Sequence, residues 1–221
     1  MPQNKLIAAL PIEERREHSG VLLDICEVHR YLEKNFARPL HLSTRAEMFK
    51  LMVSRLDFFS ERPLYLEFGV FKGASMRYWS QKLKNKAARL HGFDSFYGLP
   101  ESWERLPKGT FSTHGKSPAL RDPRVKIHPG WFQDTLPEYI APPHDALIIN
   151  FDADLYSSTK FVLEQLKAKN LLSAGSWLYF DEFTYLNQEF RAFKEFLAET
   201  GMRFKYVAET SCERCVIFQK I

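Results

Sequence analysis

The chain has 221 residues, a length that favours one domain with a small appendage and allows a sizeable buried core. Hydrophobic residues make up 45% and charged residues 26%, ordinary globular values that exclude collagen-like, coiled-coil and intrinsically disordered classes. The net charge of +4 is too small to indicate a nucleic-acid partner unless the basic residues cluster, so we expect no nucleic acid.

Residues 1–60 are predicted to form a helical region, because apolar residues recur there every three or four positions. Val28 and Leu32 belong to one such stretch, and Met48 and Met52 belong to a second. Two interpretations of this region stay open. The first is a helical layer packed on the core. The second is a cap, lid or oligomerisation arm, and an oligomerisation arm would make a second copy of the chain a partner.

From residue 61 onwards, short apolar runs alternate with helical segments, a pattern typical of an α/β fold. The expected strands cover residues 64–68, 90–93, 124–128, 146–151, 176–180, 204–208 and 215–218. The expected helices cover residues 73–84, 157–170 and 188–200. Only a short turn separates the last two strands, and such a turn joins antiparallel strands but not parallel ones. We therefore predict a three-layer, Rossmann-like domain over residues 61–221, with a mostly parallel seven-stranded sheet and a C-terminal antiparallel hairpin.

A glycine-containing loop follows the first expected strand. Gly69 and Gly73 permit a tight turn and a close approach of the backbone to a ligand. Phe71 occupies the central position where the dinucleotide-binding fingerprint requires glycine, so that fingerprint is absent. The loop is therefore either a ligand-binding loop of another kind or a tight turn without a ligand.

Asp94 ends the second expected strand, about 25 residues beyond Gly69. In nucleotide-binding sheets, a carboxylate that binds the ribose is expected at roughly this distance from the first loop. The alternative is a surface aspartate in a turn.

Four carboxylates follow two further strands. Asp152 and Asp154 come after the fourth expected strand, and Asp181 and Glu182 come after the fifth. If these strands are neighbours, their ends lie about 5 Å apart and the four acids share one crevice. Like charges at that distance need protons or a cation, and oxygen ligands suit a hard divalent ion such as Mg²⁺. The alternative is helix capping at two separate loop ends.

Five segments occur together and in the order found in one known family. They are Leu66–Ser75, Phe93–Pro100, Gly130–Pro137, Asp152–Thr159 and Phe180–Glu182. With these segments the chain resembles the macrocin O-methyltransferase (TylF/MycF-like) family of S-adenosylmethionine-dependent enzymes. The resemblance runs from about residue 64 to about residue 197, and it implies that residues 61–221 form a class I methyltransferase domain.

The resemblance also implies roles for individual residues. Contacts with S-adenosylmethionine are implied for Glu67, Gly69, Val70, Phe71, Gly73, Ser75, Asp94, Ser95, Gly130, Trp131, Phe132 and Asp152. It implies that Asp152, Asp181 and Glu182 are ligands of Mg²⁺ and that Asp154 is the general base. Glu182 replaces the aspartate that the family usually has at this position, so the geometry of the metal site stays open.

These roles predict magnesium-assisted O-methylation of a small molecule, at a hydroxyl of a sugar or secondary metabolite. Two alternatives stay open: a nicotinamide-dependent Rossmann oxidoreductase, and a cofactor-binding module without catalytic activity. Residues 100–123 are rich in proline, glycine and basic residues, and they form either a solvated loop or a lid over an acidic substrate.

The sequence also bears on where the protein works. It contains no apolar run long enough to span a bilayer, so we expect no membrane partner. The first ten residues, followed by Pro11, do not resemble a secretory signal peptide. Three cysteines argue against a disulfide framework. We therefore expect a cytoplasmic location.

Overall fold

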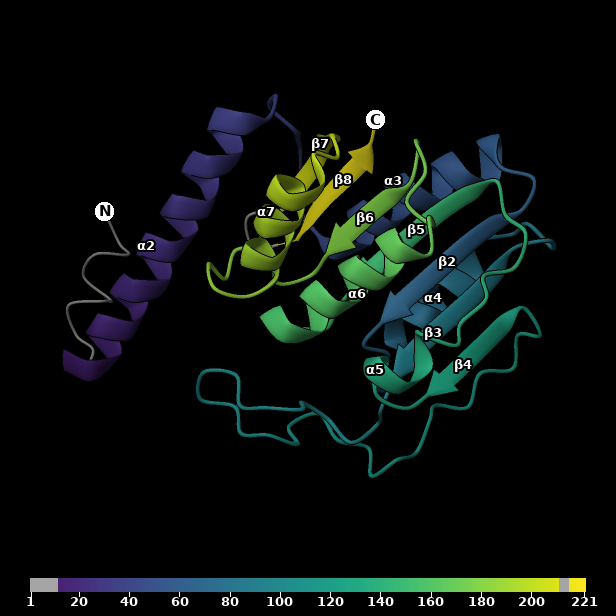
Figure 1. The fold of residues 1–221 in the computed structure, drawn as a ribbon, viewed down its shortest axis with the longest axis horizontal. Helices are drawn as coiled ribbons and strands as arrows, with labels where there is room; N and C mark the ends of the chain where they lie inside the picture. The colour runs from purple at the N-terminus through teal and green to yellow at the C-terminus, as the bar shows by residue number, and fades with distance from the viewer. Residues whose placement is uncertain (1–11, 211–214) are drawn as a thin grey trace.

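The computed structural model describes residues 12–210 and 215–221. Its elements in chain order are α2 (Ile12–Asn35), β1 (Leu40–Leu42), α3 (Arg45–Phe59), β2 (Pro63–Phe68), α4 (Ala74–Lys82), β3 (Arg89–Asp94), β4 (Val125–Pro129), α5 (Phe132–Thr135), β5 (Ala146–Phe151), α6 (Tyr156–Ala168), β6 (Trp177–Phe180), α7 (Glu189–Thr200), β7 (Phe204–Thr210) and β8 (Val216–Lys220). All seven strands expected from the sequence are present, and helices lie between them as the pattern predicts (Figure 1).

Within residues 12–210 and 215–221, the strands form one sheet of eight, in the order β1-β7-β8-β6-β5-β2-β3-β4. Neighbouring strands run parallel except where β8 pairs with β6 and with β7, so the expected C-terminal antiparallel hairpin is confirmed. The turn of that hairpin, residues 211–214, lies outside the described residues.

The fold class is confirmed, but the sheet has one strand more than the seven expected. The additional strand is β1, which pairs in parallel with β7 and starts with Leu40 opposite Ala208. It has three residues and lies between two stretches of helical periodicity, so it leaves no strand pattern in the sequence.

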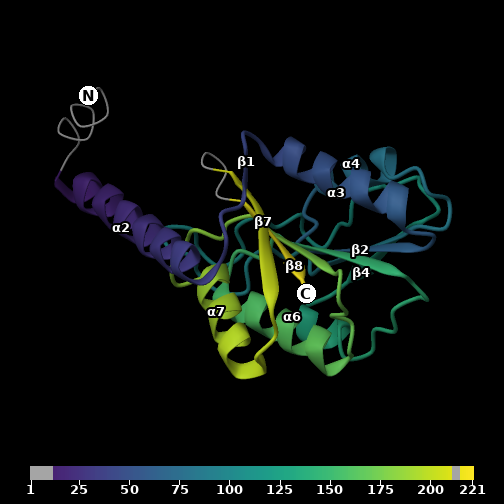
Figure 2. The same ribbon diagram turned by 90° about the horizontal axis from the view of Figure 1, so that it is seen from above.

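Helices cover both faces of the sheet, with α3 and α4 on one face and α6 and α7 on the other (Figure 2). Strand β2 is buried along its whole length, and its side chains alternate between the two faces. Leu66 and Phe68 join the core formed with α6 and α7, whereas Tyr65 joins the core formed with α3 and α4. Each such buried side chain contributes roughly 1.5–3 kcal/mol, so both helical layers stabilise the same central strand.

Phenylalanine rings fix α7 on the sheet. The ring of Phe193 packs against Phe180 of β6 and Phe218 of β8, with centroid distances of 5.2 and 4.6 Å. The same ring meets Phe204 of β7 at 5.3 Å. Several of the 19 phenylalanines in the chain therefore serve the core.

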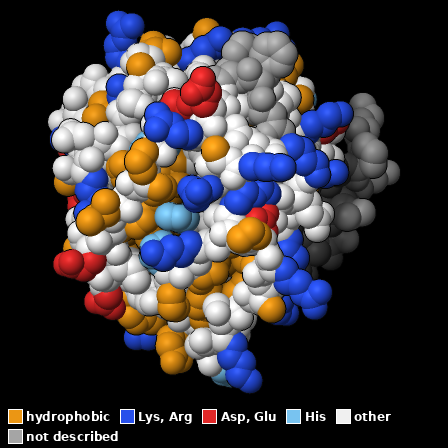
Figure 3. Space-filling view, turned by 90° about the vertical axis from the view of Figure 1, so that its right-hand side faces the viewer, with side chains coloured by type: hydrophobic (Ala, Val, Ile, Leu, Met, Phe, Trp, Pro, Cys, Tyr) orange, Lys and Arg blue, Asp and Glu red, His pale blue; other side chains and the backbone are white. Residues whose placement is uncertain are grey.

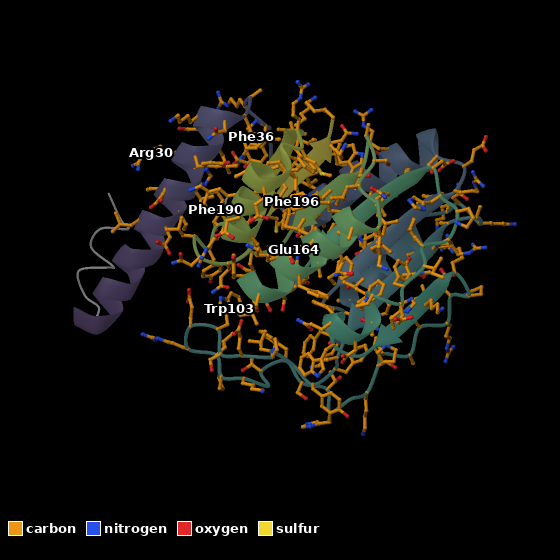
Figure 4. All side chains as sticks on the ribbon, viewed as in Figure 1. Arg30, Phe36, Trp103, Glu164, Phe190 and Phe196 are labelled. Carbon is orange, nitrogen blue, oxygen red and sulfur yellow. The ribbon has the colours of Figure 1, made fainter. Side chains whose placement is uncertain are left out.

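Helix α2 extends away from the sheet, and the part near its C-terminal end packs on the core (Figures 1 and 2). Val28 and Leu32 are buried, and the ring of Tyr31 meets that of Phe190 in α7 at 5.3 Å. Phe36, which follows α2 (Figure 4), packs against the same core, and its ring lies 5.3 Å from that of Phe218 in β8. The division of the chain at residue 60 stays a prediction.

No described helix is both long enough and apolar enough to cross a membrane. The face seen from the right-hand side of Figure 1 carries many Lys and Arg side chains and few acidic ones (Figure 3). Basic side chains therefore gather on this face of the molecule.

Candidate functional site

The strand order reverses at β2, which has β3 on one side and β5 on the other. In parallel α/β sheets, ligands bind at the carboxyl ends of the strands beside such a point. A cavity of about 300 Å³ opens there. It is lined by Gly69, Phe71, Asp94, Ser95, Gly98, Leu99, Pro100, Trp103, Phe111, Trp131, Phe132, Gln133, Asp152, Ala153, Asp154, Ser158, Asp181 and Glu182.

The loop after β2 is a tight turn that glycine makes possible. Gly69 and Gly73 have φ values of +95° and +74°, in the region that favours glycine. A Cβ atom on Gly69 would lie 1.8 Å from the carbonyl oxygen of Asp152. The backbone N–H of Gly73 donates to the carbonyl of Val70 at 2.7 Å and closes the turn just before α4. The loop thus brings its backbone directly against the end of β5.

Asp94 connects two loops at the edge of the cavity. Its Oδ2 accepts hydrogen bonds from the backbone N–H groups of Val70 and Phe71, at 2.8 and 2.7 Å. Its Oδ1 accepts from the N–H of Phe96 at 2.7 Å. The carboxylate therefore fixes the loop after β2 as well as the one after β3, and its role toward a ribose stays a prediction.

We expect Asp94→Asn to lower the melting temperature. The amide presents an NH₂ donor where a carboxylate oxygen accepted a hydrogen bond. Loss of one charge-assisted bond costs about 1.5–3 kcal/mol. At this chain length that predicts a melting temperature lower by roughly 3–12 °C. Thermal denaturation measures this effect, with the exposed Asp134→Asn as control. An unchanged melting temperature for Asp94→Asn would contradict the role of this carboxylate in joining the two loops.

The four carboxylates predicted from the strand ends line the same cavity. Strands β5 and β6 are neighbours, so Asp152 and Asp181 begin adjacent loops about 5 Å apart. Burial, with Glu182 and Asp181 nearby, raises the pKa of Asp154 to about 7. Burial and the proximity of Asp181 also raise the pKa of Asp152 well above its usual value. Ionising all of these groups together is therefore costly unless a cation is near.

Arg45, at the start of α3, reaches this crevice. Its Nη2 donates a hydrogen bond to Oδ2 of Asp181. The hydroxyl of Tyr179 and the thiol of Cys215 donate to Oδ1 of the same carboxylate. Asp181 is only 3% exposed, so these three side chains take the place of water around its charge.

The donor set of the crevice suits a divalent cation. The carboxylates of Asp152, Asp181 and Glu182 are the hard oxygen ligands that Mg²⁺ prefers. Glu189 is fully buried nearby; its Oε2 accepts from the N–H of Glu182 at 3.2 Å, whereas Oε1 has no partner among the described residues. A buried carboxylate oxygen without a partner favours a nearby proton or cation. In the described part of the chain, however, no three His, Cys, Asp or Glu side chains are arranged as a metal-binding group, and Asp181 faces Arg45.

Some residues predicted to contact the cofactor lie outside the lining of the cavity. They are Glu67, Val70, Gly73, Ser75 and Gly130. Glu67 is 1% exposed, and its carboxylate accepts a hydrogen bond from the Tyr65 hydroxyl at 2.6 Å. Burial raises the pKa of Glu67 to about 8. The remaining predicted site residues do line the cavity, and the roles of the whole set stay predictions.

Unusual backbone conformations gather around the cavity. Phe71, Phe111 and Asp154 have φ values of +48°, +67° and +60°. Non-glycine residues rarely adopt this region, and such strain is common at functional sites. Three residues of the lining therefore hold conformations that the surrounding structure must enforce.

The loop between β3 and β4 supplies cavity residues that the sequence pattern did not single out. Trp103, on this loop (Figure 4), is 7% exposed and packs with Leu155, next to Asp154. Its ring meets that of Tyr185 at 5.3 Å. Further along the loop, the ring of Phe111 meets Phe71 at 5.8 Å. This part of the loop therefore packs onto the site and forms an aromatic wall of the cavity.

Known proteins match the chain in sequence and in fold. An enzyme from Streptomyces olivaceus, 8-demethyl-8-(2,3-dimethoxy-alpha-L-rhamnosyl)-tetracenomycin-C 4'-O-methyltransferase, is 31% identical over 139 residues, 53% of this chain and 52% of that protein. Mycinamicin III 3''-O-methyltransferase from Micromonospora griseorubida is 32% identical over 94 residues, 42% of this chain and 34% of that protein. The chain thus matches about half, or less, of the length of these curated relatives.

A solved structure supports the fold, and one family matches much of the chain. The "Structure of the O-methyltransferase NovP" aligns with a TM-score of 0.60 and 24% identity, covering 79% of this chain and 78% of that one. This likeness shows the fold alone. The family described as Macrocin-O-methyltransferase (TylF) matches residues 111–219, which include β4 to β8 and most of the acidic crevice. Residues 111–219 of the chain are therefore similar in sequence to the macrocin O-methyltransferase (TylF) family.

Proposed function

We propose that the chain transfers the methyl group of S-adenosylmethionine to a hydroxyl of a small molecule, a sugar or another secondary metabolite. The observation that carries this proposal is the family match together with a single cavity that joins the Gly69 loop, Asp94 and Asp154. The names of the two relatives, both O-methyltransferases, support the reaction class. The nicotinamide-dependent alternative is not favoured.

The cofactor is proposed to lie across the ends of β2, β3 and β4. Its methionine end would lie along the Gly69 loop, with Glu67, Gly73 and Ser75 supporting that loop. Its ribose would lie at Asp94, beside Ser95. Its adenine would lie near Gly130, against Trp131 and Phe132. The ring of Phe132 is held by an edge contact with Phe68 at 5.6 Å, which supports a firm apolar surface at that end.

Asp154 is proposed to be the general base. The hydroxyl of a sugar or alcohol has a pKa far above 7, so it attacks readily only as its proton leaves. Asp154 would accept that proton while the oxygen forms a bond to the methyl carbon and the bond from that carbon to sulfur breaks. The protein would hold the acceptor oxygen, the methyl carbon and the sulfur in line, with about 3 Å between the oxygen and the methyl carbon.

A divalent cation, proposed as Mg²⁺, would be held by Asp152, Asp181 and Glu182. When bound, it would lower the pKa of the acceptor hydroxyl. The unpartnered oxygen of buried Glu189 supports a cation in this region. The longer side chain of Glu182 still offers the oxygen ligand that the ion prefers.

The aromatic wall is proposed to bind the acceptor. Phe71, Trp103 and Phe111 line the cavity from the two loops that face each other. Their ring faces suit the apolar side of a sugar ring or the flat body of an aromatic metabolite. The indole Nε1 of Trp103 has no hydrogen-bond partner among the described residues, which leaves a donor for an acceptor oxygen.

Residues 1–60 have a proposed role as well. We propose that they contribute helix α2 as a cap or oligomerisation arm beside the methyltransferase domain of residues 61–221, whereas β1 and α3 belong to the sheet and to the helical layer that covers it. The extension of α2 from the sheet supports this (Figure 2). The side chain of Leu23 on this helix is 70% exposed, which supports it as well. A cytoplasmic location is proposed as well, because three cysteines in 221 residues are few for a disulfide framework.

Two measurements test the proposed function. Calorimetry should show binding of S-adenosylhomocysteine, which should also raise the melting temperature, whereas NAD⁺ should change neither. Incubation with labelled S-adenosylmethionine and a panel of rhamnose glycosides should then transfer label to a hydroxyl. Absence of S-adenosylhomocysteine binding would rule out the proposal. Binding without transfer to any glycoside would favour the non-catalytic alternative.

A further inference from the structure

Arg45 occupies an unusual position for a cation. It is the first residue of α3, directly after Thr44, whose hydroxyl accepts the backbone N–H of Glu47 at 3.3 Å and caps the helix. The start of a helix carries partial positive charge, so a cation is unfavourable there unless an anion offsets it. Asp181, 136 positions away in the sequence, supplies that anion. The ion pair with Asp181 therefore balances an arginine that its own helix disfavours.

The charge of Arg45 acts on much of the acidic crevice. Burial alone would lower the pKa of the guanidinium. Asp181, Tyr179 and Asp152 more than offset the burial, so this pKa is raised overall. In turn, Arg45 partly counters the burial that raises the pKa of Asp152 and of Glu67. The guanidinium thus neutralises carboxylates that a metal ion at this place would neutralise.

We propose that Arg45 and a divalent cation bind the acidic crevice in alternation, with Arg45 holding Asp181 in the metal-free protein and releasing it when Mg²⁺ binds. The oxygen at issue is Oδ2 of Asp181, because Oδ1 already accepts from Tyr179 and Cys215. Two cations cannot share one carboxylate oxygen without strong repulsion. The inference rests on the proposed function only for the identity of the metal ligands.

The surroundings of Arg45 allow such an exchange. The side chain of Arg45 is 40% exposed, against 5% for Asp181. Arg45 can therefore turn toward solvent while Asp181 stays held by Tyr179 and the core stays closed. The movement would fall on the junction between β1 and α3, where the N–H of Ser43 is held by the carboxylate of Glu47 at 2.7 Å.

Binding of Mn²⁺ to the full chain, without cofactor or acceptor, tests this inference. Paramagnetic resonance measures free Mn²⁺, and calorimetry with Mg²⁺ as competitor identifies the shared site. We expect Arg45→Gln to bind Mn²⁺ about tenfold to hundredfold more tightly than the wild type, because it removes a charge-assisted bond that the metal otherwise displaces. Adding Asp181→Asn to Arg45→Gln should cancel the gain. The control Arg55→Gln removes the same charge from α3, about 15 Å along the helix, and should bind as the wild type does.

Hydrogen exchange of the wild type gives a second measurement that needs no variant. Saturating Mn²⁺ should speed the exchange of backbone amides at residues 43–47, since their anchor on Asp181 is released. Equal Mn²⁺ affinity of Arg45→Gln and the wild type would overturn the inference, as would no binding by folded Arg45→Gln. If Arg45→Gln does not fold, the wild type decides: absence of Mn²⁺ binding, or binding without faster exchange at residues 43–47, would overturn it. Because neither readout involves methyl transfer, failure here is distinct from failure of the proposed function.

Discussion

Replacing Asp154 with asparagine is expected to remove nearly all methyl transfer while leaving the fold and the binding of S-adenosylhomocysteine close to those of the wild type. The amide cannot accept the proton of the acceptor hydroxyl, and a general base contributes about 10²- to 10⁴-fold to the rate. We therefore expect kcat to fall by about that factor. Folding should persist, because asparagine readily adopts the positive φ of +60° that this position requires.

The measurement is transfer of labelled methyl to an acceptor that the wild type accepts, with calorimetry on the same preparations. Asp134→Asn, an exposed acid on α5, removes one negative charge away from the proton transfer and should keep full activity. If Asp154→Asn retained more than about a tenth of the wild-type rate, Asp154 could not be the base. A loss of S-adenosylhomocysteine binding would instead assign the residue to the cofactor.

The strand ends were the predictable part of the site. Asp94, Asp152 and Asp181 each end or follow a short apolar run in the sequence, and apolar runs of that length mark buried strands. Parallel strands bring their carboxyl ends to one edge of the sheet, so acids at those ends lie at the same edge. Because β5 pairs with β6 and β2 pairs with β5, these three acids line one cavity.

Arg45 could not be predicted from local pattern. The segment from Thr44 to Glu47 has the sequence typical of a helix start, and the structure has a helix there. Nothing within those residues indicates that the arginine reaches Asp181 at the end of β6. That contact depends on how α3 lies on the sheet, which is a long-range property of the fold.

The loop between β3 and β4 was unpredictable for another reason. Its proline, glycine and basic residues carry no periodicity, so the sequence indicates a loop but not which side chains turn inward. Trp103 and Phe111 are large apolar side chains in a polar segment, and this contrast was the available indication that they turn inward. For Glu189, the indication of burial was its position next to Phe190 at the start of a helix with an apolar face. The structure buries both side chains.

Gly69→Ala is expected to be the most damaging single-methyl change in the loop after β2. A Cβ atom at this position would lie 1.8 Å from the carbonyl oxygen of Asp152, and φ is +95°. The left-handed conformation costs a non-glycine residue about 1–2 kcal/mol, and relief of such a clash costs about 1–3 kcal/mol more. The free energy of unfolding should therefore fall by about 2–5 kcal/mol.

Gly175→Ala provides the matched control, because Gly175 has nearly the same φ, +89°, but nothing lies within 4 Å of its Cβ position. Gly175→Ala should lower the free energy of unfolding only by the cost of the left-handed conformation for alanine, about 1–2 kcal/mol. Chemical denaturation gives both free energies. Calorimetry with S-adenosylhomocysteine should show weaker binding for Gly69→Ala alone, since relief of the clash must move either the Gly69 loop or the start of the loop that carries Asp152. Equal destabilisation by the two substitutions would mean that the backbone contact between β2 and β5 does not constrain this site.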